Sequence, residues 1–501
     1  MDASARSSSR VAAGAMMRSS VMACMVARAA HGRQRSRAAA GGGTIRAPHA
    51  APRSALTHDR MRHGIQHPAR LVPLAFLAAI ALGTGLLMLP GAWAADGNSP
   101  WLTALFTATS AVCVTGLAVV DTGTAWSPFG QGVILLLFQV GGFGIMTGAT
   151  LLGLLVSQRL RLATRLVAQA ETRSLGLGDV MGVLKLILAV TLAVEATAAA
   201  VLTLQFHVGH GQPLGRALWN GVFHAVSAFN NAGLSTYSDS LVGFATDPVV
   251  LLPVMLAIMI GGVGFPVLFE MHRQRGGWSK WSVHTRITLA GSAFLLVAGM
   301  GAILALEWHH TLGGHGLVGK LLGAAFHSVS ARTAGFNTLD VGAMASETWA
   351  IHYVLMFIGG GSAGTAGGIK VTTFFLLGFV VWAEVRGQRD VTAFNRRIAV
   401  DAQRQALTVA LLGMALLAFA TLALMALTAL PLEVLMFEAI SAFATVGLST
   451  GITAQLPPAA QLVLVALMFI GRVGTITVAT ALALRSRPRA YRYPEEHPIV
   501  G

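Results

Sequence analysis

A short pattern that suits cation coordination recurs four times along the chain. Each copy has a Phe, a Ser-Ala pair four residues later, and a Gly five or six residues after the Ser. The glycines are Gly116, Gly233, Gly335 and Gly447, separated by 117, 102 and 112 residues. A dehydrated cation needs replacement oxygens, which backbone carbonyls from several loops can supply as a ring. Gly suits such loops because it adopts conformations closed to other residues and places no side chain on the axis.

The residues beside these glycines are apolar or small and carry no charge. No ring of carboxylates is therefore predicted at the glycines, which disfavours a divalent cation. Carbonyl dipoles suit a monovalent cation better. The pattern predicts a monovalent-cation selectivity filter built from Thr115, Gly116, Ala232, Gly233, Ala334, Gly335, Val446 and Gly447.

A second set of glycines follows the first at nearly constant distance. Its clusters begin at Gly141, Gly261, Gly359 and Gly471, which lie 25, 28, 24 and 24 residues after the four filter glycines. Close packing of transmembrane helices explains glycines in either set, but it explains the constant spacing poorly. Together the two sets indicate a unit of about 110 residues that is used four times.

The composition is that of a polytopic membrane protein. Of 501 residues, 54% are hydrophobic and 11% charged, whereas soluble domains carry about 25% charged residues. Apolar runs such as 71–94 and 406–430 approach or exceed the ~20 residues that cross a bilayer as a helix. The two cysteines, Cys24 and Cys113, lie far apart, so no disulfide framework is predicted.

Each unit is predicted to hold an apolar outer helix, a shorter pore helix that ends near the filter glycine, and an apolar inner helix. The pore segments are too short to span and carry polar residues, as expected of re-entrant helices buried in protein. We predict an all-α polytopic membrane fold with four such repeats around a pseudo-fourfold pore, at 71–156, 183–270, 286–383 and 404–484. Outer helices are expected near 71–94, 183–206, 286–307 and 404–429, pore helices near 101–113, 216–230, 319–332 and 433–444, and inner helices near 131–156, 249–270, 350–383 and 460–484.

Much of the net charge of +15 lies in the N-terminal tail, because residues 1–70 hold 12 Arg and two Asp. We predict that 1–70 is a disordered cytoplasmic tail or reflects a start assigned too far upstream, with Met61 as the alternative start. A transit peptide or a nucleic-acid-binding arm is the weaker interpretation, and no nucleic-acid partner is expected.

The remaining charges predict the orientation. After residue 156, the segments predicted inside carry 18 Lys and Arg, whereas those predicted outside carry only Arg216 and Lys320. The positive-inside rule then places both termini, including the tail 485–501, in the cytoplasm of a multi-pass inner-membrane protein. External acids, among them Asp96, Asp121, Asp239, Asp247, Asp340 and Glu347, either concentrate cations at the mouth or simply form a solvated face.

The third inner segment is interrupted by six glycines within the ten residues Gly359–Gly368. A regular helix there would lose about 1 kcal/mol per Gly relative to Ala. We predict a broken helix whose irregular loop lines the cavity, with a tightly packed helix crossing as the alternative.

Three charged residues within apolar segments need partners, because a charge at that depth is costly. Arg472 is expected to face the cavity or a partner, or else to bond helix-end carbonyls. Arg332, three residues before Gly335, is expected to brace the filter through carbonyls. Glu195 is expected to be paired, either as a structural hydrogen-bonding group or as a proton or sodium site.

These motifs resemble the Trk/Ktr/HKT superfamily of potassium transporters, and most of all the Ktr-type membrane subunit, over roughly residues 70–490. The motifs are Thr115-Gly-Leu, Asn230-Asn-Ala-Gly-Leu-Ser, Arg332-Thr-Ala-Gly-Phe-Asn, Thr445-Val-Gly-Leu-Ser-Thr, Gly361-Ser-Ala-Gly-Thr-Ala-Gly-Gly-Ile-Lys and Gly471-Arg-Val-Gly-Thr. The resemblance implies a potassium pore with one filter glycine per repeat. It also implies an intramembrane gate formed by Gly359, Gly360, Gly361, Gly364, Gly367, Gly368, Lys370 and Arg472.

The resemblance implies potassium uptake through a channel-like pore, with a sodium- or proton-coupled symporter as the alternative. Potassium is then the substrate, with no cofactor and no other metal, and sodium is left open as an activating or coupling ion. The expected partners are the lipid bilayer, a second copy of the chain, and a ring of cytosolic nucleotide-binding regulatory subunits. An enzyme is not expected, because Lys370 and Arg472, both cationic, are the only cavity-facing charges predicted. Nor does the sequence contain a nucleotide-binding loop of its own.

Overall fold

The computed structural model describes residues 68–95, 97–144, 177–274 and 277–474, together with Pro494 and Glu496. All of them belong to the compact unit His63–Gly501. The predicted tail 1–70 is too long, because its last residues 68–70 belong to the first described helix, Pro68–Leu87. Residues 1–67, Asp96, the far ends of the first and fourth inner helices, most of the loop 157–185, and nearly all of the tail 485–501 lie outside the described residues.

The described part is mostly helical, and its helices occur in the predicted order. The outer helices are α3 (Pro68–Leu87), α7 (Leu177–Leu204), α11 (Val283–Glu307) and α15 (Val400–Leu427). The pore helices are α4 (Trp101–Val112), α8 (Leu214–Asn230), α12 (Leu317–Ser330) and α16 (Leu432–Ala444). The inner helices are Pro128–Gly144, α9 (Pro248–Val263) with α10 (Phe265–Arg273), α13 (Ser346–Phe357) with α14 (Val371–Val385), and α17 (Pro458–Phe469) with the π-turn η7 (Ile470–Gly474).

The remaining elements are short. One antiparallel hairpin pairs β1 (Thr392–Ala393) with β2 (Arg396–Arg397). The other short elements are η1 (Pro90–Ala92), α5 (Thr122–Ala125), η2 (Gln205–Gly209), η3 (Val242–Phe244), η4 (Trp278–Lys280), η5 (Val341–Ala343) and η6 (Thr453–Gln455). The all-α class predicted from the sequence is thereby confirmed.

The pore helices begin at defined residues. Pro100, Pro213 and Pro431 stand immediately before α4, α8 and α16. Proline is tolerated there because the first N–H groups of a helix have no partner within it. At their far ends α8 and α16 stop at Asn231 and Thr445, which are both left-handed. The chain therefore turns sharply into the loop that carries each filter glycine.

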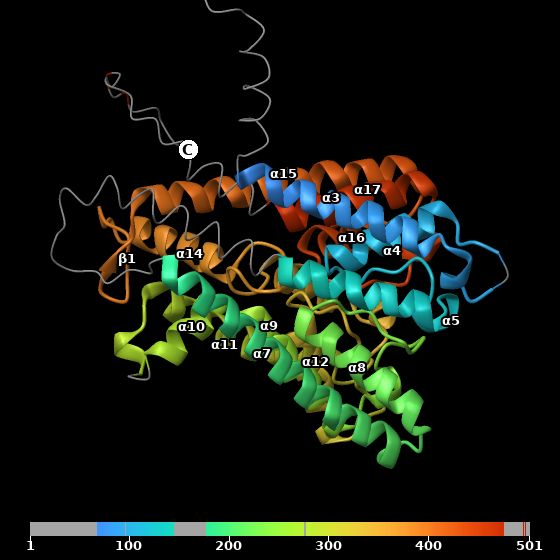
Figure 1. Cartoon of the computed structure of the whole chain (residues 1–501). Helices are drawn as coiled ribbons and strands as arrows, with labels where there is room; N and C mark the ends of the chain where they lie inside the picture. The colour runs from blue at the N-terminus through green and yellow to red at the C-terminus, as the bar shows by residue number, and fades with distance from the viewer. Residues whose placement is uncertain are drawn as a thin grey trace, which may run out of the picture. The chain divides into compact units, whose positions relative to one another are not determined.

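Helix contacts close the four repeats into a ring. Each outer helix packs on the pore helix of its own repeat. Between repeats, α9 contacts α12, α13 contacts α16, and α17 contacts α4. In Figure 1 the first and last repeats, blue and red, accordingly lie side by side. Repeats 1 and 2 meet where the rings of Phe138 and Phe223 pack edge to face with centroids 5.5 Å apart.

Two predicted helices are shorter than the sequence indicated. The segment 249–270 is not one helix, because α9 and α10 meet at an angle of 91° at Gly264. Gly264 has φ +97° and the following Pro266 restarts the helix, so the bend has a local cause. The outer helix predicted over 71–94 ends at Leu87, because Pro90 excludes the helical conformation from the residue before it.

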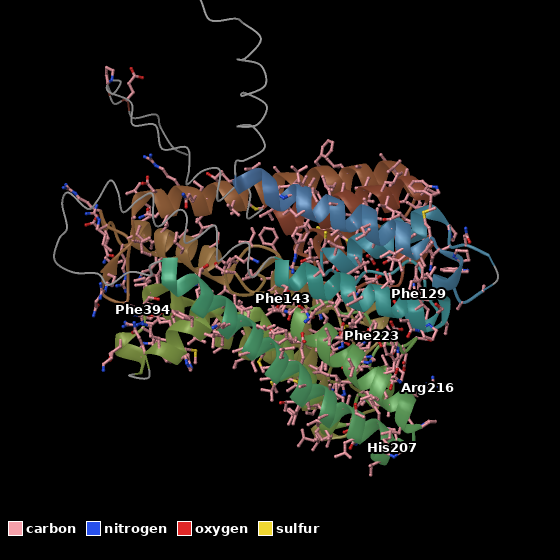
Figure 2. All side chains as sticks on the ribbon, viewed as in Figure 1. Phe129, Phe143, His207, Arg216, Phe223 and Phe394 are labelled. Atoms are coloured by element: carbon pink, nitrogen blue, oxygen red, sulfur yellow. The ribbon has the colours of Figure 1, made fainter. Side chains whose placement is uncertain are left out.

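Three described helices are long and apolar enough to cross a membrane: Lys185–Gly209, Val283–Glu307 and Val400–Leu427. The bent pair α9–α10 provides a fourth candidate span. Figure 2 shows Phe394, in the basic hairpin, at one end of the described unit, and His207 and Arg216 at the other. Segments predicted to lie on opposite sides of the membrane thus lie at opposite ends of the unit.

Candidate ion pathway

The four filter glycines meet in a closed ring. A methyl group added to any one of them would overlap the carbonyl oxygen of the residue before the next glycine. These contacts run from Gly116 to Ala232 O at 2.4 Å, from Gly233 to Ala334 O at 2.5 Å, from Gly335 to Val446 O at 2.4 Å, and from Gly447 to Thr115 O at 2.3 Å. The eight residues predicted at the filter therefore converge, and only glycine fits at four of them.

The same loops share an uncommon backbone conformation. All four glycines have positive φ, with values of +94°, +67°, +80° and +95° along the chain. The residue two positions earlier is also positive in every loop: Val114, Asn231, Thr333 and Thr445. Positive φ is uncommon for residues other than glycine, and such strain of about 1–3 kcal/mol tends to gather at functional sites.

The repeated serine of the motif holds each loop in place. Ser110 and Ser441 accept hydrogen bonds at their Oγ atoms from the N–H groups of Gly116 and Gly447, both at 3.1 Å. In the other two repeats the serine hydroxyl donates instead to a carbonyl just after the glycine, that of Leu234 or Phe336. The four serines are buried, so each hydrogen bond replaces one with water that burial removes.

The third copy of the motif is one residue shorter, yet its loop keeps the common geometry. In every repeat the serine carbonyl accepts a hydrogen bond from the N–H of the residue before the glycine. The distances are 2.7 Å for Thr115, 2.8 Å for Ala232, 2.9 Å for Ala334 and 2.8 Å for Val446. The missing residue is therefore absorbed between Ser330 and Ala334, and the filter ring keeps its symmetry there.

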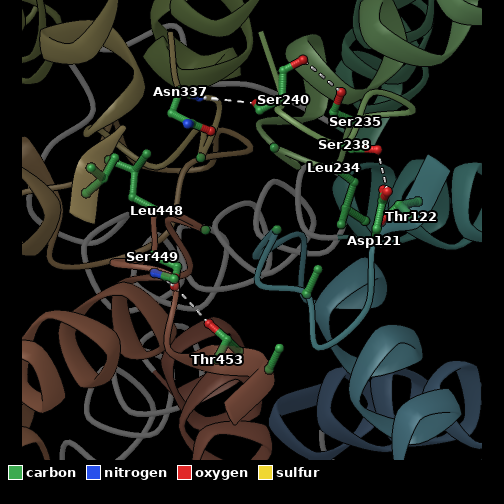
Figure 3. A pocket seen from close by; sticks show the side chains of 18 of the residues that line it. Asp121, Thr122, Leu234, Ser235, Ser238, Ser240, Asn337, Leu448, Ser449 and Thr453 are labelled. Carbon is green, nitrogen blue, oxygen red and sulfur yellow. Dashed lines mark hydrogen bonds between the residues drawn. The ribbon is translucent and has the colours of Figure 1, made fainter. Parts of the chain in front are cut away.

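A cavity of about 260 Å³ opens onto one side of the glycine ring (Figure 3). All four filter glycines line it, and Asp121 is the single carboxylate among its lining residues. Asp121 Oδ2 accepts hydrogen bonds from Ser238 Oγ at 2.5 Å and Thr124 Oγ1 at 2.8 Å. The mouth is thus lined by hydroxyls, carbonyls and apolar groups, with no ring of carboxylates.

Four of the external acids act as local caps. Asp121, Asp239, Asp247 and Asp340 each accept a hydrogen bond from a nearby backbone N–H, at 2.8, 2.9, 2.8 and 2.9 Å. These contacts fix turns and helix starts in the loops around the mouth. The structure therefore provides a local reason for these charges, beside any effect on cation concentration.

The glycine-rich segment is an irregular loop, as predicted, because α13 ends at Phe357 and α14 begins only at Val371. It lies against three of the filter loops. Thr365 Oγ1 donates to the carbonyl of Phe229 at 3.3 Å, at the end of the second pore helix. A methyl group added to Gly367 would lie 2.3 Å from Ala444 O, and one added to Gly359 would lie 3.4 Å from Thr333 Cγ2.

Two cationic side chains, Lys370 and Arg472, bind carbonyls of this loop, and Arg332 is a third that is described below. Lys370 Nζ donates to Ala366 O at 2.5 Å and Gly367 O at 3.2 Å, so it caps its own segment. Arg472 Nη1 reaches from the fourth inner helix to Thr365 O at 2.5 Å. Among the described residues, no carboxylate forms an ion pair with either side chain. Carbonyl dipoles serve as their observed partners.

Arg332 is placed differently from the prediction. Its Nη1 and Nη2 donate to Ser292 O and Ser292 Oγ at 3.2 and 3.0 Å, and Nη2 also lies 3.4 Å from Gly359 O. It therefore joins α11 to the start of the glycine-rich loop and does not brace carbonyls of the filter. The physical reason is that Arg332 lies at the inner end of α12, where the loop is the nearest source of free carbonyls.

Glu195 is hydrogen bonded to amides. It accepts from Gln139 Nε2 and Asn230 Nδ2, both at 3.2 Å, and it is 7% exposed. The network ties α7 and the first inner helix to the end of the second pore helix. The structural interpretation of Glu195 agrees with this geometry.

Sequence reasoning missed Thr365 and the role of the motif serines. Thr365 is one of two hydroxyl-bearing residues within the glycine-rich run, the other being Ser362. A hydroxyl in a segment that lacks helical hydrogen bonds is a usable signal, because it must find a partner elsewhere. The serines recurred in all four copies, but their spacing alone did not say that they hold the glycine loop.

The comparisons with known proteins agree with this geometry. Residues 34–488 match the family described as TrkH, cation transport protein. The Ktr system potassium uptake protein B of Bacillus subtilis is 37% identical over 438 residues, covering 87% of this chain and 97% of that protein. The potassium/sodium uptake protein NtpJ of Enterococcus hirae is 34% identical over 447 residues, with coverage of 87% and 97%.

A solved structure supports the fold. The crystal structure of the potassium transporter TrkH from Vibrio parahaemolyticus superposes with a TM-score of 0.64, covering 85% of this chain and 86% of that one. Its sequence identity is 18%, so this likeness bears on the fold alone.

Proposed function

The chain belongs to the TrkH family of cation transport proteins, and from this premise we propose that it takes up potassium across the cytoplasmic membrane through a channel-like pore. As a member of this family it is a membrane transport protein and not an enzyme. The names of its relatives, a potassium uptake protein and a potassium/sodium uptake protein, support potassium as the substrate.

The observation that carries the proposal is the closed ring of four glycine loops. Carbonyl oxygens from all four repeats meet where no side chain fits. Such a ring replaces the hydration shell of a monovalent cation. We assign the filter to Thr115, Gly116, Ala232, Gly233, Ala334, Gly335, Val446 and Gly447.

We assign the gate to the loop Gly359–Gly368 with Lys370 and Arg472. The loop lies directly against three filter loops, and Arg472 holds it by the carbonyl of Thr365. Cationic groups on a cation path oppose conduction until they move or are compensated. The arrangement therefore fits a closed state, and release of the bond between Arg472 and Thr365 is the step that opens the path.

A sodium- or proton-coupled symporter gains no support from Glu195, whose observed partners are the amides of Gln139 and Asn230. Whether sodium activates or couples to transport is tested by measuring potassium uptake with and without sodium. Potassium uptake that persists without added sodium, and that is not accompanied by proton uptake, would contradict coupling to either ion.

We further propose an inner-membrane location with both termini cytoplasmic, a homodimer, and a ring of cytosolic nucleotide-binding subunits on the cytoplasmic face. Names containing "Ktr system" support a membrane subunit that works with others. The exposed Arg396 and Arg397 of the hairpin offer a basic surface at the end predicted to be cytoplasmic. Anionic lipid is the alternative ligand for that charge.

Complementation tests the proposal. A cell lacking its own potassium uptake systems, and supplied with this chain and a regulatory partner, should grow at low external potassium. Gly116→Ser and Gly335→Ser should abolish growth, because each side chain would meet a carbonyl of the neighbouring repeat. Failure of the unmutated chain, once its presence in the membrane is verified, would contradict potassium uptake.

A further inference from the structure

We infer that His224, His327 and Glu438 are positioning residues that fix the outer side of the filter and thereby set its discrimination between potassium and sodium. The inference rests on the proposed function and deepens it. The three residues share one position, because each directly follows the Phe of the repeated motif. Thr107 stands there in the first repeat.

In the second repeat, His224 ties the pore helix to the segment beyond the glycine. Its Nδ1 lies 2.7 Å from Asn220 O, and its Nε2 lies 2.9 Å from Ser235 Oγ. A carbonyl only accepts, so Nδ1 carries the proton and Nε2 is an acceptor for the Ser235 hydroxyl, whose 2.9 Å contact with Nε2 is shorter than its 3.2 Å contact with Ser240 O. Ser235 Oγ in turn accepts from the N–H of Tyr237 at 3.0 Å, which extends the support outward.

In the third repeat, His327 ties the pore helix to the segment beyond the glycine through backbone N–H groups. Its Nε2 accepts from the N–H groups of Thr338 and Leu339 at 3.3 and 3.1 Å. An imidazole nitrogen that accepts two N–H groups is unprotonated, so His327 has the same tautomer as His224. The two N–H groups are buried, and they would lose an acceptor if His327 were removed.

In the fourth repeat a carboxylate replaces the imidazole. Glu438 accepts from the hydroxyls of Ser449 and Thr453, the latter at 3.1 Å. Ser449 lies two residues after Gly447, just as Ser235 lies two residues after Gly233. Ser449 Oγ also accepts from the N–H of Gly451 at 2.9 Å.

The three side chains differ in chemistry but supply the same thing, an acceptor aimed at the segment that leaves the filter glycine. All three have no measurable exposure. A residue needed only to fill the core at this place would be apolar, because burying a polar group is costly unless it is hydrogen bonded. Packing alone therefore does not explain the pattern, whereas a need to hold the outer filter segments does.

His352 provides a matched control. It is equally buried, and its ring centroid lies 5.9 Å from that of His327. Its Nδ1 bonds Thr348 O one turn earlier in α13, so its hydrogen bond supports its own helix, although its ring also packs 6.2 Å from that of Phe437. Replacing His352 therefore removes a buried imidazole, and its ring packing, without removing a hydrogen bond to a segment that leaves a filter glycine.

The test measures initial potassium and sodium uptake by the full chain in cells that lack their own potassium uptake systems. His224→Leu, His327→Leu and Glu438→Leu should each lower the ratio of potassium to sodium uptake by about tenfold, the factor expected when a buried hydrogen bond is lost. Each matching Gln variant keeps an acceptor at similar reach and should recover most of the ratio. His352→Leu should leave the ratio unchanged.

Leu variants that transport potassium with an unchanged ratio would overturn the inference, as would Gln variants that are no better than Leu. If a Leu variant fails to reach the membrane, Ser235→Ala and Ser449→Ala remove the same bonds from the loop side. An unchanged ratio in both would then overturn the inference. The proposed function fails separately, since only that failure abolishes potassium uptake by the unmutated chain.

Discussion

At the scale of single residues, each filter glycine meets two separate demands. Its φ is positive, and its Cα faces a carbonyl oxygen of the next repeat across a space that a methyl group would overfill. The first demand concerns the backbone of one loop. The second concerns the ring, because an intruding side chain displaces the oxygens that a cation needs.

Substitutions at Gly447 and Gly451 separate the two demands. Both residues have positive φ, at +95° and +91°. A methyl group at Gly447 would lie 2.3 Å from Thr115 O, whereas one at Gly451 would have no atom within 4 Å. We expect Gly447→Ala to abolish potassium uptake. Gly451→Ala should cost about 1 kcal/mol of folding stability and retain uptake.

Initial uptake rates and the amount of each variant in the membrane are the measurements. Loss of uptake in both variants would mean that backbone strain is sufficient to abolish function. Uptake retained in both would mean that neither strain nor intrusion into the ring decides function at these positions.

At the scale of elements, the broken third inner helix differs from its counterparts. In the other three repeats, the first glycine of the inner cluster packs against a carbonyl of a pore helix. A methyl group added to Gly141, Gly261 or Gly471 would lie within 2.0 Å of that carbonyl oxygen. A methyl group added to Gly359 would instead meet Gly367 O of its own loop. At this glycine the third inner segment is therefore a loop, whereas the other three inner segments are helical at the corresponding glycine. The contacts of this loop are carbonyls and single side chains, which part more easily than a packed helix face.

Removing the guanidinium of Arg472 should loosen this loop. The bond from Arg472 to Thr365 O is charge-assisted, and such bonds contribute about 1.5–3 kcal/mol. We expect Arg472→Ala to raise potassium flux or to weaken its control by about tenfold or more. Flux into vesicles, with and without the regulatory partner, measures both.

Arg472→Gln is the matched variant, because it keeps a donor but removes the charge. A flux intermediate between those of the unmutated chain and Arg472→Ala is expected. Transport by Arg472→Ala indistinguishable from the unmutated chain would remove Arg472 from the gate.

The start of α9 carries a pH-dependent cap outside the membrane-spanning segments. Burial raises the pKa of Asp247, but hydrogen bonds from His210, Gln205 and the N–H groups of Val249 and Val250 outweigh it and hold the pKa below its ordinary value. A lowered folded-state pKa contributes stability above the unfolded pKa, and this stability is lost as pH falls through the folded pKa. We therefore expect Asp247→Asn to be less stable than the unmutated chain at neutral pH.

Thermal unfolding in detergent across a pH series measures the difference, which should shrink as the solution becomes acidic. Asp390→Asn is the control, because its ion pair with Arg397 is largely exposed and contributes little. A difference for Asp247→Asn that stays constant with pH would show that the cap acts by shape and not by charge.

Local patterns in the sequence predicted some elements well and others poorly. The glycine loops and the break after Phe357 were predictable because unusual backbone conformation demands unusual residues at those very positions. The bend at Gly264 was missed because its Gly-Phe-Pro signal stands in a continuous apolar run. The partners of Arg332 were not predictable, because they come from α11 and from Gly359, which only the fold brings together.

At the scale of the whole molecule, the filter loops follow the fourfold symmetry and the cationic groups beneath them do not. The filter loops remain equivalent even where the third copy is one residue shorter. Among the described residues, the cationic groups that bind the glycine-rich loop come from repeats 3 and 4: Arg332, Lys370 and Arg472. Under the proposed function, we expect selectivity to depend on the symmetric filter loops and control to depend on these asymmetric cationic groups.

The orientation of the ring is the last property that the charges predict, and two introduced cysteines test it. Ser238 is exposed in a loop at the mouth, and Arg396 is exposed in the basic hairpin. The chain suits this test, since Cys113 is fully buried and Cys24 can be replaced by Ser. A membrane-impermeant maleimide should label Ser238→Cys in intact cells, and Arg396→Cys only after permeabilisation. The physical reason is that arginine-rich segments are retained on the cytoplasmic side. The opposite labelling pattern would turn the glycine ring toward the cytoplasm, with the gate outside it, and would contradict uptake through an external mouth.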